Sequence, residues 1–236
     1  MTLTNLPVQF RRWIRGRLGL AQTSYAQCGE DLIIDAVFRG LNIDKPSYID
    51  VGAYDPRQMS NTYLFYKRGA HGVCIEPQPL RCARIQRARR KDLCLNIGIA
   101  AKNHEGMEFY VLSQEALSTF SKIEAERVCR YGHTRITRKL KIPLMTLAEV
   151  SKKFSLPAPD FISIDLEGDE LEALQTLDWT HGRPKVLCVE TLTYTEDKTE
   201  KKQVKTIEWL EKKGYFLYAD TYINSIFVDK ALWKNR

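Results

Sequence analysis

The sequence predicts an α/β fold: a single domain with a mainly parallel sheet that ends in an antiparallel hairpin. From residue 24 to about residue 228, short apolar runs alternate with helical patterns, without a repeat or a Gly/Ser-rich linker. A length of 236 residues, 44% of them hydrophobic, suits one large domain. The last two apolar runs are joined by almost no connection, which permits only an antiparallel pair.

Seven segments are expected to form strands, because each is a short run rich in apolar residues. They are 47–52, 72–76, 93–100, 161–167, 185–190, 215–220 and 222–228. The first five are separated by helical segments and are expected to run parallel. The last two meet at Asp220 and Thr221 and form the hairpin.

Helices are expected between the strands. In the segment 80–91, Leu80, Ile85 and Ala88 form an apolar stripe among six basic residues that would face solvent. The other expected helices occupy 60–69 and 199–213, and two more begin near Glu30 and near Asp169.

The composition indicates a soluble, cytoplasmic chain. Its mean hydropathy is −0.36, and no apolar run approaches the roughly 18 residues that span a bilayer. The six cysteines form no CxxC pair, and Cys74 and Cys188 lie inside apolar runs. We therefore expect reduced cysteines and no zinc site.

The formal net charge of +7 is partly concentrated near the N-terminus. The segment 10–20, FRRWIRGRLGL, mixes four arginines with apolar residues, as a helix on an anionic membrane surface does. A basic tail and a helix packed on its own domain are the alternatives. We accordingly divide the chain into a basic amphipathic segment, 1–23, and one domain, 24–236.

Polar residues close nearly every central strand, at the edge where open α/β sheets bind ligands. Glu76 ends the second strand, 26 residues after Asp50. A carboxylate at that position can accept hydrogen bonds from both hydroxyls of a ribose. The loop in YIDVGAYDP (48–56) holds a single glycine. The pyrophosphate of a dinucleotide must approach the loop backbone closely, which requires several glycines. This loop therefore argues against NAD as the cofactor.

These segments together resemble the FkbM-type family, a branch of the class I S-adenosylmethionine-dependent methyltransferases. The resemblance runs from about residue 24 to residue 192, and the terminal hairpin is consistent with it. It is carried by SYAQCGEDLII (24–34), YIDVGAYDP (48–56), SNTYLFY (60–66), CIEPQP (74–79), LNIGIA (95–100), STF (118–120) and ISIDLEGDELEAL (162–174).

The resemblance implies a Rossmann-like domain with a seven-stranded sheet and S-adenosylmethionine as cofactor. The implied cofactor-binding residues follow the chain: Gln27 and Glu30 toward the amino-acid end, Asp50, Gly52 and Ala53 in the turn under the methionine, Glu76 and Pro77 at the ribose, and Asn96 and Ile97 beside the adenine. Asp31 is a further candidate, with helix capping as its alternative role.

Two carboxylates are the expected catalytic residues. Methyl transfer to a hydroxyl needs a base within reach of the acceptor oxygen. In class I enzymes the end of the fourth strand faces the methyl group, so the resemblance implies Asp165 as base or orienting group, supported by Glu167. Glu190 and His133 are alternative bases. Asp165, Glu167, Asp169 or Glu190 permit a Mg²⁺-assisted version, but nothing requires a metal, and none is expected.

The predicted function is O-methyl transfer to a hydroxyl of a sugar, glycan or related small metabolite. The basic segment 121–141 is expected to form part of the acceptor wall, which would suit a phosphate-linked acceptor, or else a solvated lid. An RNA methyltransferase is an alternative, motivated by a pI of about 9.0. The chain contains neither an NPPY segment, which methylation of base amino groups would use, nor a Pro-Cys pair, which C5 methylation would use. No nucleic acid is therefore expected as a partner. A non-catalytic protein that binds a partner or membrane through 10–20, and an NAD-dependent dehydrogenase, are further alternatives.

Overall fold

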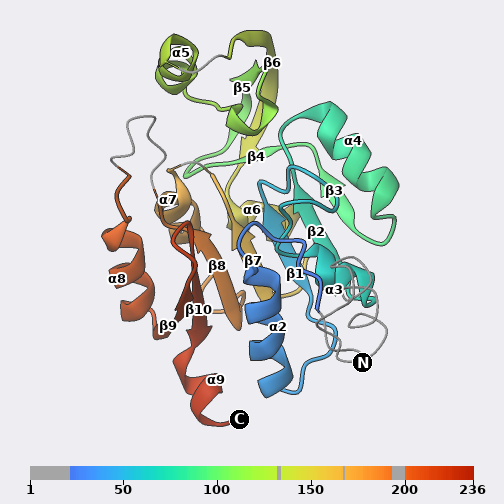
Figure 1. Cartoon of the computed structure of the whole chain (residues 1–236), viewed down its shortest axis with the longest axis vertical. Helices are drawn as coiled ribbons and strands as arrows, with labels where there is room; N and C mark the ends of the chain where they lie inside the picture. The colour runs from blue at the N-terminus through green and yellow to red at the C-terminus, as the bar shows by residue number, and fades with distance from the viewer. Residues whose placement is uncertain (1–21, 132–133, 167, 193–199) are drawn as a thin grey trace, which may run out of the picture.

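The computed structural model describes residues 22–131, 134–166, 168–192 and 200–236. Its centre is a seven-stranded sheet with the order β3-β2-β1-β7-β8-β10-β9 (Figure 1). The predicted α/β fold with a mostly parallel sheet and a terminal hairpin is confirmed. Within the described ranges, no helix is both long and apolar enough to cross a membrane. The segment 10–20 lies outside the described residues, so membrane contact through it stays a prediction.

Five short strands, all buried except the edge strand of residues 93–95, form the parallel part of the sheet. They are β1 (Tyr48–Val51), β2 (Gly72–Ile75), β3 (Leu93–Leu95), β7 (Phe161–Ile164) and β8 (Val186–Glu190). From β1 the chain first builds outward to β2 and β3, and later returns to add β7 and β8 on the other side. Strand order therefore reverses between β1 and β7, which is where such sheets bind ligands.

The hairpin consists of β9 (Tyr215–Asp220) and β10 (Asn224–Asp229). Strand β10 pairs antiparallel with both β9 and β8. The turn between the two strands brings Tyr222, with a φ of 76°, to the carboxyl end of the parallel strands.

Helices cover both faces of the sheet and enclose two hydrophobic cores. One face is covered by α2 (Glu30–Gly40), α3 (Tyr63–Lys67) and α4 (Pro79–Ala88). The other is covered by α6 (Leu147–Lys153), α7 (Glu170–Gln175) and α8 (Val204–Lys212). The chain ends with α9 (Lys230–Lys234).

The expected helix at 80–91 is shorter than predicted, and only part of its expected stripe is buried. Ile85 is fully buried as expected, but Leu80 is 63% exposed, and Arg81 and Arg89 are buried. Helix α4 ends at Ala88. The Arg89 guanidinium then turns inward and forms an ion pair with the Asp92 carboxylate, with a distance of 2.7 Å from Nε to Oδ2. These two arginines are buried because they have partners outside the helix, and the spacing of apolar residues does not show such partners.

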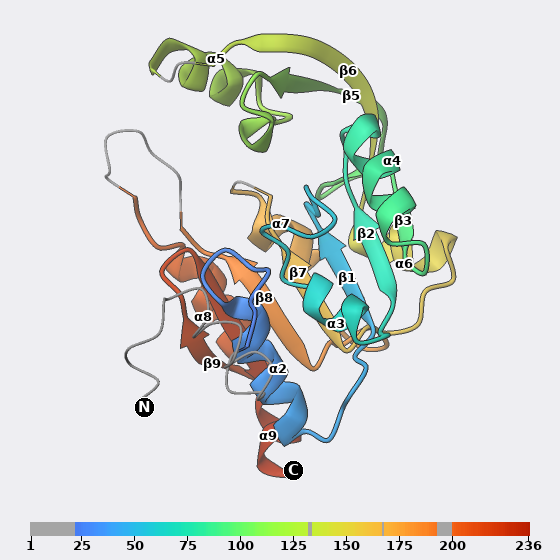
Figure 2. The ribbon, with the colours of Figure 1, turned by 45° about the vertical axis from the view of Figure 1, so that its right-hand side comes forward.

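The expected strand at 93–100 is broken in two, and its second part belongs to another sheet. Strand β4 (Gly98–Ile99) pairs with β6 (Ile136–Met145), which also pairs with β5 (His104–Leu112). Between β5 and β6 lie the short helix η2 (Glu115–Leu117) and α5 (Lys122–Tyr131). We call residues 104–145 the arm. Figure 2 shows it arching above the carboxyl ends of the central strands, with α5 at its far end.

Candidate active site

A cavity of about 730 Å³ lies at the carboxyl ends of the parallel strands, beneath the arm. The strand ends contribute Gly52, Glu76 and Asp165 to its wall. The arm contributes residues 115–121, and the turn of the hairpin contributes Tyr222. Elements far apart in the sequence thus converge on one enclosed space at the point where strand order reverses.

The cavity gathers most of the residues that the sequence predicted. Gln27, Gly52, Glu76, Pro77, Ile97 and Asp165 line it, together with Glu190 and Asp169 from the alternative readings. Glu30, Asp50, Ala53 and Asn96 are placed elsewhere, as described below. Glu167 and His133 lie outside the described residues.

Glu76 is held rigidly at the end of β2 and is only 5% exposed. Its Oε1 accepts a hydrogen bond of 2.8 Å from the backbone N–H of Gln78, and its Oε2 accepts one of 3.0 Å from that of Tyr54. Each oxygen keeps a second lone pair, which suits two neighbouring hydroxyls of a ribose. Burial raises the pKa of the Glu76 carboxyl to about 7, against the lowering effect of the two N–H donors.

Asn96 supports the strand end behind the cavity wall. Its Nδ2 donates to the backbone carbonyls of Glu76 and Pro77, at 3.0 and 2.8 Å. The half-buried amide therefore fixes the path of the chain at the ribose position, while the next residue, Ile97, forms the apolar wall. Both hydrogens of the Asn96 amide are used by the backbone, and the predicted contact between Asn96 and adenine stays a prediction.

Asp50 and Ala53 also lie away from the cavity. Side chains alternate along a strand, so the carboxylate of Asp50 points to the layer of α3 and α4. There it accepts a hydrogen bond from Thr62 Oγ1 and lies 3.9 Å from the Arg89 guanidinium. Burial raises the pKa of Asp50, and Arg89 opposes that shift. Ala53 packs on Cys74 and Ile85. Of this turn, Val51, Gly52 and Tyr54 line the cavity.

The leading segment before α2 is anchored by its acidic residues. The buried Glu30 accepts hydrogen bonds from Thr221 Oγ1 (2.7 Å) and Asn224 Nδ2 (3.1 Å), which ties this segment to the terminal hairpin. Asp31 accepts from Ser24 and from the N–H of Tyr25. These bonds hold the loop so that Gln27 reaches the cavity. Glu30 and Asp31 thus have structural partners, and Gln27 alone of the three is open to a ligand.

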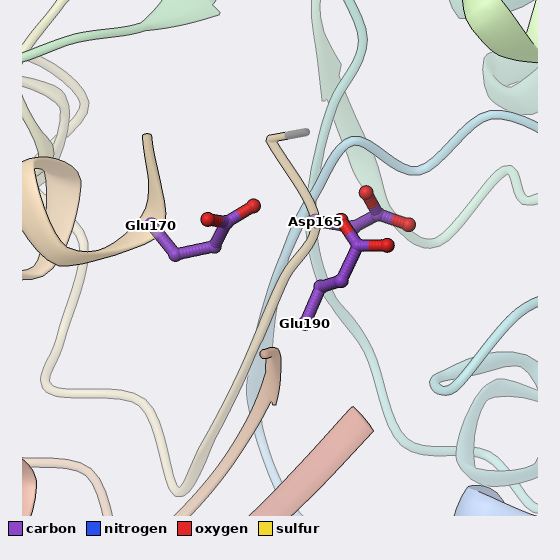
Figure 3. A group of neighbouring side chains, drawn as sticks. All are labelled: Asp165, Glu170 and Glu190. Atoms are coloured by element: carbon purple, nitrogen blue, oxygen red, sulfur yellow. The ribbon is translucent and has the colours of Figure 1, made fainter. Parts of the chain in front are cut away.

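Three carboxylates meet beside the ends of β7 and β8. Figure 3 shows the carboxylates of Asp165 and Glu190 side by side and Glu170 extending toward them, and one oxygen of each lies within 4.8 Å of the others. Asp165 is exposed to the cavity, whereas Glu190 and Glu170 are buried. The arrangement therefore places the Asp165 carboxylate in the cavity wall, where the general base is expected, with two further carboxylates beside it.

Glu170 has a structural task that the sequence reading missed. Its Oε1 accepts from the backbone N–H groups of Leu166 and Gly168, both at 3.0 Å, and its Oε2 accepts from Gln203 Nε2 at 3.0 Å. Because both oxygens are engaged in holding the turn after β7, they are poorly available as metal ligands. The sequence signal that could have indicated this role is an acidic residue in the first turn of a helix, two residues after Gly168.

Tyr54, Arg81 and Glu115 form a second contact that the sequence reading missed. The Arg81 guanidinium lies 3.7 Å from the centre of the Tyr54 ring and donates to the Tyr54 carbonyl at 3.0 Å. It also forms an ion pair of 2.5 Å with Glu115 on η2 of the arm. This contact links the loop after β1 to the arm across the cavity. The local sequence gives no signal that Arg81 pairs with Glu115, which is 34 positions later.

Comparisons with known proteins identify the family of the chain. The model of the methyltransferase FkbM domain family matches residues 50–217. A search of curated proteins found no match. Similar solved structures include a TehB-like S-adenosylmethionine-dependent methyltransferase from Corynebacterium glutamicum, with 11% identity and a TM-score of 0.45, covering 94% of this chain and 97% of that one.

Two other solved structures are similar at the same distant level. An O-methyltransferase from Bacillus cereus in complex with S-adenosylhomocysteine has 8% identity and a TM-score of 0.41, covering 92% of this chain and 86% of that one. The 1,6-didemethyltoxoflavin-N1-methyltransferase of Burkholderia thailandensis has 8% identity and a TM-score of 0.44, covering 94% and 88%. The family match spans most of the domain, including the strand ends that form the cavity. The chain belongs to the FkbM family of S-adenosylmethionine-dependent methyltransferases.

Proposed function

We propose that the enzyme transfers the methyl group to a hydroxyl of a sugar, glycan or related small metabolite, with Asp165 as the general base. The observation that carries this proposal is the position of the Asp165 carboxylate. It is exposed to the cavity at the end of β7, with Glu190 beside it. A hydroxyl loses its proton readily only to a base within hydrogen-bond reach.

The chain provides a fitting site for S-adenosylmethionine on one side of the cavity. Glu76 offers two free lone pairs to a ribose, and Pro77 and Ile97 give an apolar surface for a base. Gly52 lines the cavity at the turn after β1, where the methionine part of the cofactor would lie. A cofactor without phosphates needs no further glycine there. When bound, S-adenosylmethionine supplies an electrophilic methyl group on sulfur.

The other residues of the cavity would orient the acceptor. Asp165 would accept the hydroxyl proton as the acceptor oxygen takes the methyl group that bound S-adenosylmethionine would supply. The products would be S-adenosylhomocysteine, the methylated acceptor and the protonated carboxylate of Asp165. Glu167, which lies outside the described residues, stays a predicted support of this step. The arm covers the acceptor side, where Phe109 and Phe120 help to exclude water.

The lining of the cavity argues against the alternative of RNA methylation. No described arginine or lysine of 121–141 lines it, and its wall is rich in carboxylates. A phosphodiester backbone requires the opposite charge. The absence of nucleic acid as a partner stays a prediction.

The test is methyl transfer from isotopically labelled S-adenosylmethionine to a panel of free sugars, nucleotide sugars, glycans and RNA. We expect one hydroxylated small molecule or glycan to gain the label, with an ether-linked methyl group identified by mass spectrometry and NMR. Label in RNA alone, or on nitrogen or carbon, would overturn O-methyl transfer. The panel is run in parallel with the Asp165→Asn variant, which separates enzymatic from spontaneous methylation.

We also propose a cytoplasmic location, supported by the state of the thiols. All six cysteines are free, and Cys74, Cys82 and Cys188 are buried. Chains that fold in oxidising compartments usually pair their cysteines. Alkylation of the denatured protein, isolated without reductant, should modify all six thiols; protected thiols would contradict this location.

A further inference from the structure

A hollow outside the cavity borders the loop that follows β1. Its volume is about 430 Å³, and its wall consists of residues 55–58 of this loop together with Arg84, Arg87 and Ala88 of α4. None of these described residues lines the cavity. Tyr54 and Met59, at the two ends of the loop, line the cavity instead. One short loop therefore borders both spaces, and we call the second space the arginine hollow.

The arginine hollow is positively charged. It gathers Arg57, Arg84 and Arg87, all three exposed, and, of the described carboxylates, that of Asp55 alone. Arg84 lies 3.5 Å from Asp55, measured from Nη2 to Oδ2. Among the described residues, neither Arg57 nor Arg87 has an acidic partner. Three arginines and one carboxylate give the wall a formal charge of +2.

Few acidic residues lie outside the described ranges. Residues 1–21 contain four arginines and no aspartate or glutamate. The acidic residues outside the described ranges are at position 167 and within 193–199. Their described neighbours Leu166, Leu192 and Glu200 line the cavity, and none of these three lines the arginine hollow. The charge of the arginine hollow therefore depends on the described residues.

The walls of the arginine hollow are ordered without a ligand. Asp55 is only 9% exposed, and its Oδ1 accepts hydrogen bonds from the backbone N–H groups of Arg57 and Gln58, both at 2.9 Å. On α4, Arg84 and Arg87 are three positions apart, so their side chains leave the same face of the helix. A site whose walls are already ordered loses less conformational entropy when it binds a ligand.

We infer that the arginine hollow binds a phosphate or diphosphate group carried by a small molecule. The planar guanidinium of arginine donates paired hydrogen bonds to phosphate oxygens. A group with two negative charges matches the formal charge of +2, and it has enough oxygens for all three arginines. No described residue of the basic segment 121–141 lines the arginine hollow, so the phosphate contact expected there stays a separate prediction.

Two sources can supply this group: the methyl acceptor itself, or a separate phosphorylated small molecule. The shared loop favours the acceptor, because Tyr54 and Met59 border the cavity and residues 55–58 border the arginine hollow. An acceptor that extends from the cavity across this loop, where Met59 is 52% exposed, would place its phosphate in the hollow. The choice of the acceptor as source rests on the proposed function, whereas the phosphate site itself does not.

Calorimetry with inorganic pyrophosphate tests the site. The protein is first saturated with S-adenosylhomocysteine, so that the probe does not enter the cofactor position. We expect one equivalent of pyrophosphate to bind, with an affinity that falls as the salt concentration rises. Arg84→Gln and Arg87→Gln should each weaken this binding about fivefold or more, because each removes a charged hydrogen-bond donor.

Arg90→Gln is the matched control. Arg90 is exposed in the same basic run but does not line the arginine hollow, so its replacement should weaken binding by less than about twofold. All three variants replace exposed side chains and should keep the thermal midpoint of the wild type.

Three results overturn the inference. The first is the absence of saturable pyrophosphate binding. The second is an equal affinity of all three variants, which would show only a diffuse attraction to the basic run. The third is tighter binding of single-stranded RNA than of pyrophosphate, weakened alike by all three substitutions, which would make this region a nucleic-acid surface.

Labelled methyl transfer distinguishes the two sources of the phosphate. The compound that gains the label is compared in its neutral and phosphorylated forms. If the acceptor supplies the phosphate, the phosphorylated form should have a KM about fivefold or more lower, and Arg87→Gln should remove that advantage while Arg90→Gln keeps it. Equal KM values with pyrophosphate binding intact refute the acceptor as source and leave a separate small molecule. If no hydroxyl is methylated, the proposed function fails, while calorimetry still decides the phosphate site.

Discussion

Gly52 and Asp165 meet so closely that a Cβ atom on Gly52 would lie 2.3 Å from the backbone carbonyl oxygen of Asp165. The two residues follow the paired strands β1 and β7, and the N–H of Asp165 donates to the carbonyl of Val51 at 3.1 Å. Gly52 has a φ of 79°, in the left-handed region that favours glycine. The turn beside the cofactor and the proposed base are therefore one packed unit.

The first prediction concerns this contact. Gly52→Ala should lower the free energy of unfolding by about 2–4 kcal/mol, because the positive φ and the clash with backbone both oppose a side chain. The affinity for S-adenosylhomocysteine should also fall, because the added methyl group would push the ends of β1 and β7 apart. Urea denaturation and calorimetry measure the two effects.

Gly106→Ala is the control, since a Cβ there meets only Lys141 Cβ at an ordinary 3.6 Å. It should change stability by less than about 0.5 kcal/mol. Equal stability of the two variants would show that the contact between Gly52 and Asp165 is not tight.

The second prediction is a pH dependence of cofactor binding. The pKa of the Glu76 carboxyl is raised to about 7 in the free protein, and a ribose donates hydrogen bonds best to the ionised form. Protons therefore compete with the ligand, and affinity for S-adenosylhomocysteine should fall by up to about tenfold for each pH unit below 7. Glu76→Gln should bind weakly at every pH, with a flat profile. A wild-type profile that is also flat between pH 8 and 5.5 contradicts this role.

The third prediction is the effect of the same group on stability. In the unfolded chain the carboxyl ionises near its ordinary pKa of 4.5, and in the folded protein near 7. Ionisation inside the protein thus costs stability as pH rises from about 4.5 to 7, by up to about 3 kcal/mol. Relative to wild type, Glu76→Gln should gain that amount between pH 4.5 and 8 in urea denaturation without ligand. A constant difference between the two proteins would show that burial does not penalise the charge.

The fourth prediction separates catalysis from binding. Asp165→Asn keeps the size of the side chain but removes the base, so kcat should fall about 10²- to 10⁴-fold. Affinity for S-adenosylhomocysteine should stay within about threefold, since the cofactor is held mainly by other residues. Glu172→Gln, exposed on α7, is the control and should leave kcat unchanged. An active Asp165→Asn variant would transfer the role of base to Glu190.

The central sheet could be predicted because its strands are buried on both faces. Runs such as Tyr48–Val51 and Phe161–Ile164 are apolar enough to be recognised without knowing their partners. The arm could not be predicted in the same way. In strand β6, Leu140, Ile142 and Leu144 alternate with Lys141 and Pro143 after a basic run, and the high charge and the proline obscured this period of two.

Residues whose place in the cavity wall depends on backbone position alone could be predicted. The direction of a side chain could not be predicted where it depends on partners distant in the sequence. Gly52 and Glu76 follow from their places at strand ends, and both line the cavity. The direction of the Asp50 side chain depends on Arg89, which is 39 positions later and reads locally as one of several solvent-facing arginines. No local pattern shows which arginine of such a run turns inward.

The fifth prediction tests that buried arginine. Arg89 is 0% exposed, and it donates to Asp92 at 2.7 Å and to Tyr48 Oη and Thr62 Oγ1 at 2.9 Å each. Arg89→Met should cost about 3–5 kcal/mol in urea denaturation, because it leaves the carboxylates of Asp92 and Asp50 buried without a cation. Arg90→Met, at the exposed next position, should cost less than about 0.5 kcal/mol. If the two variants are equally stable, the network does not hold the turn, and the placement of Asp50 away from the cofactor needs another cause.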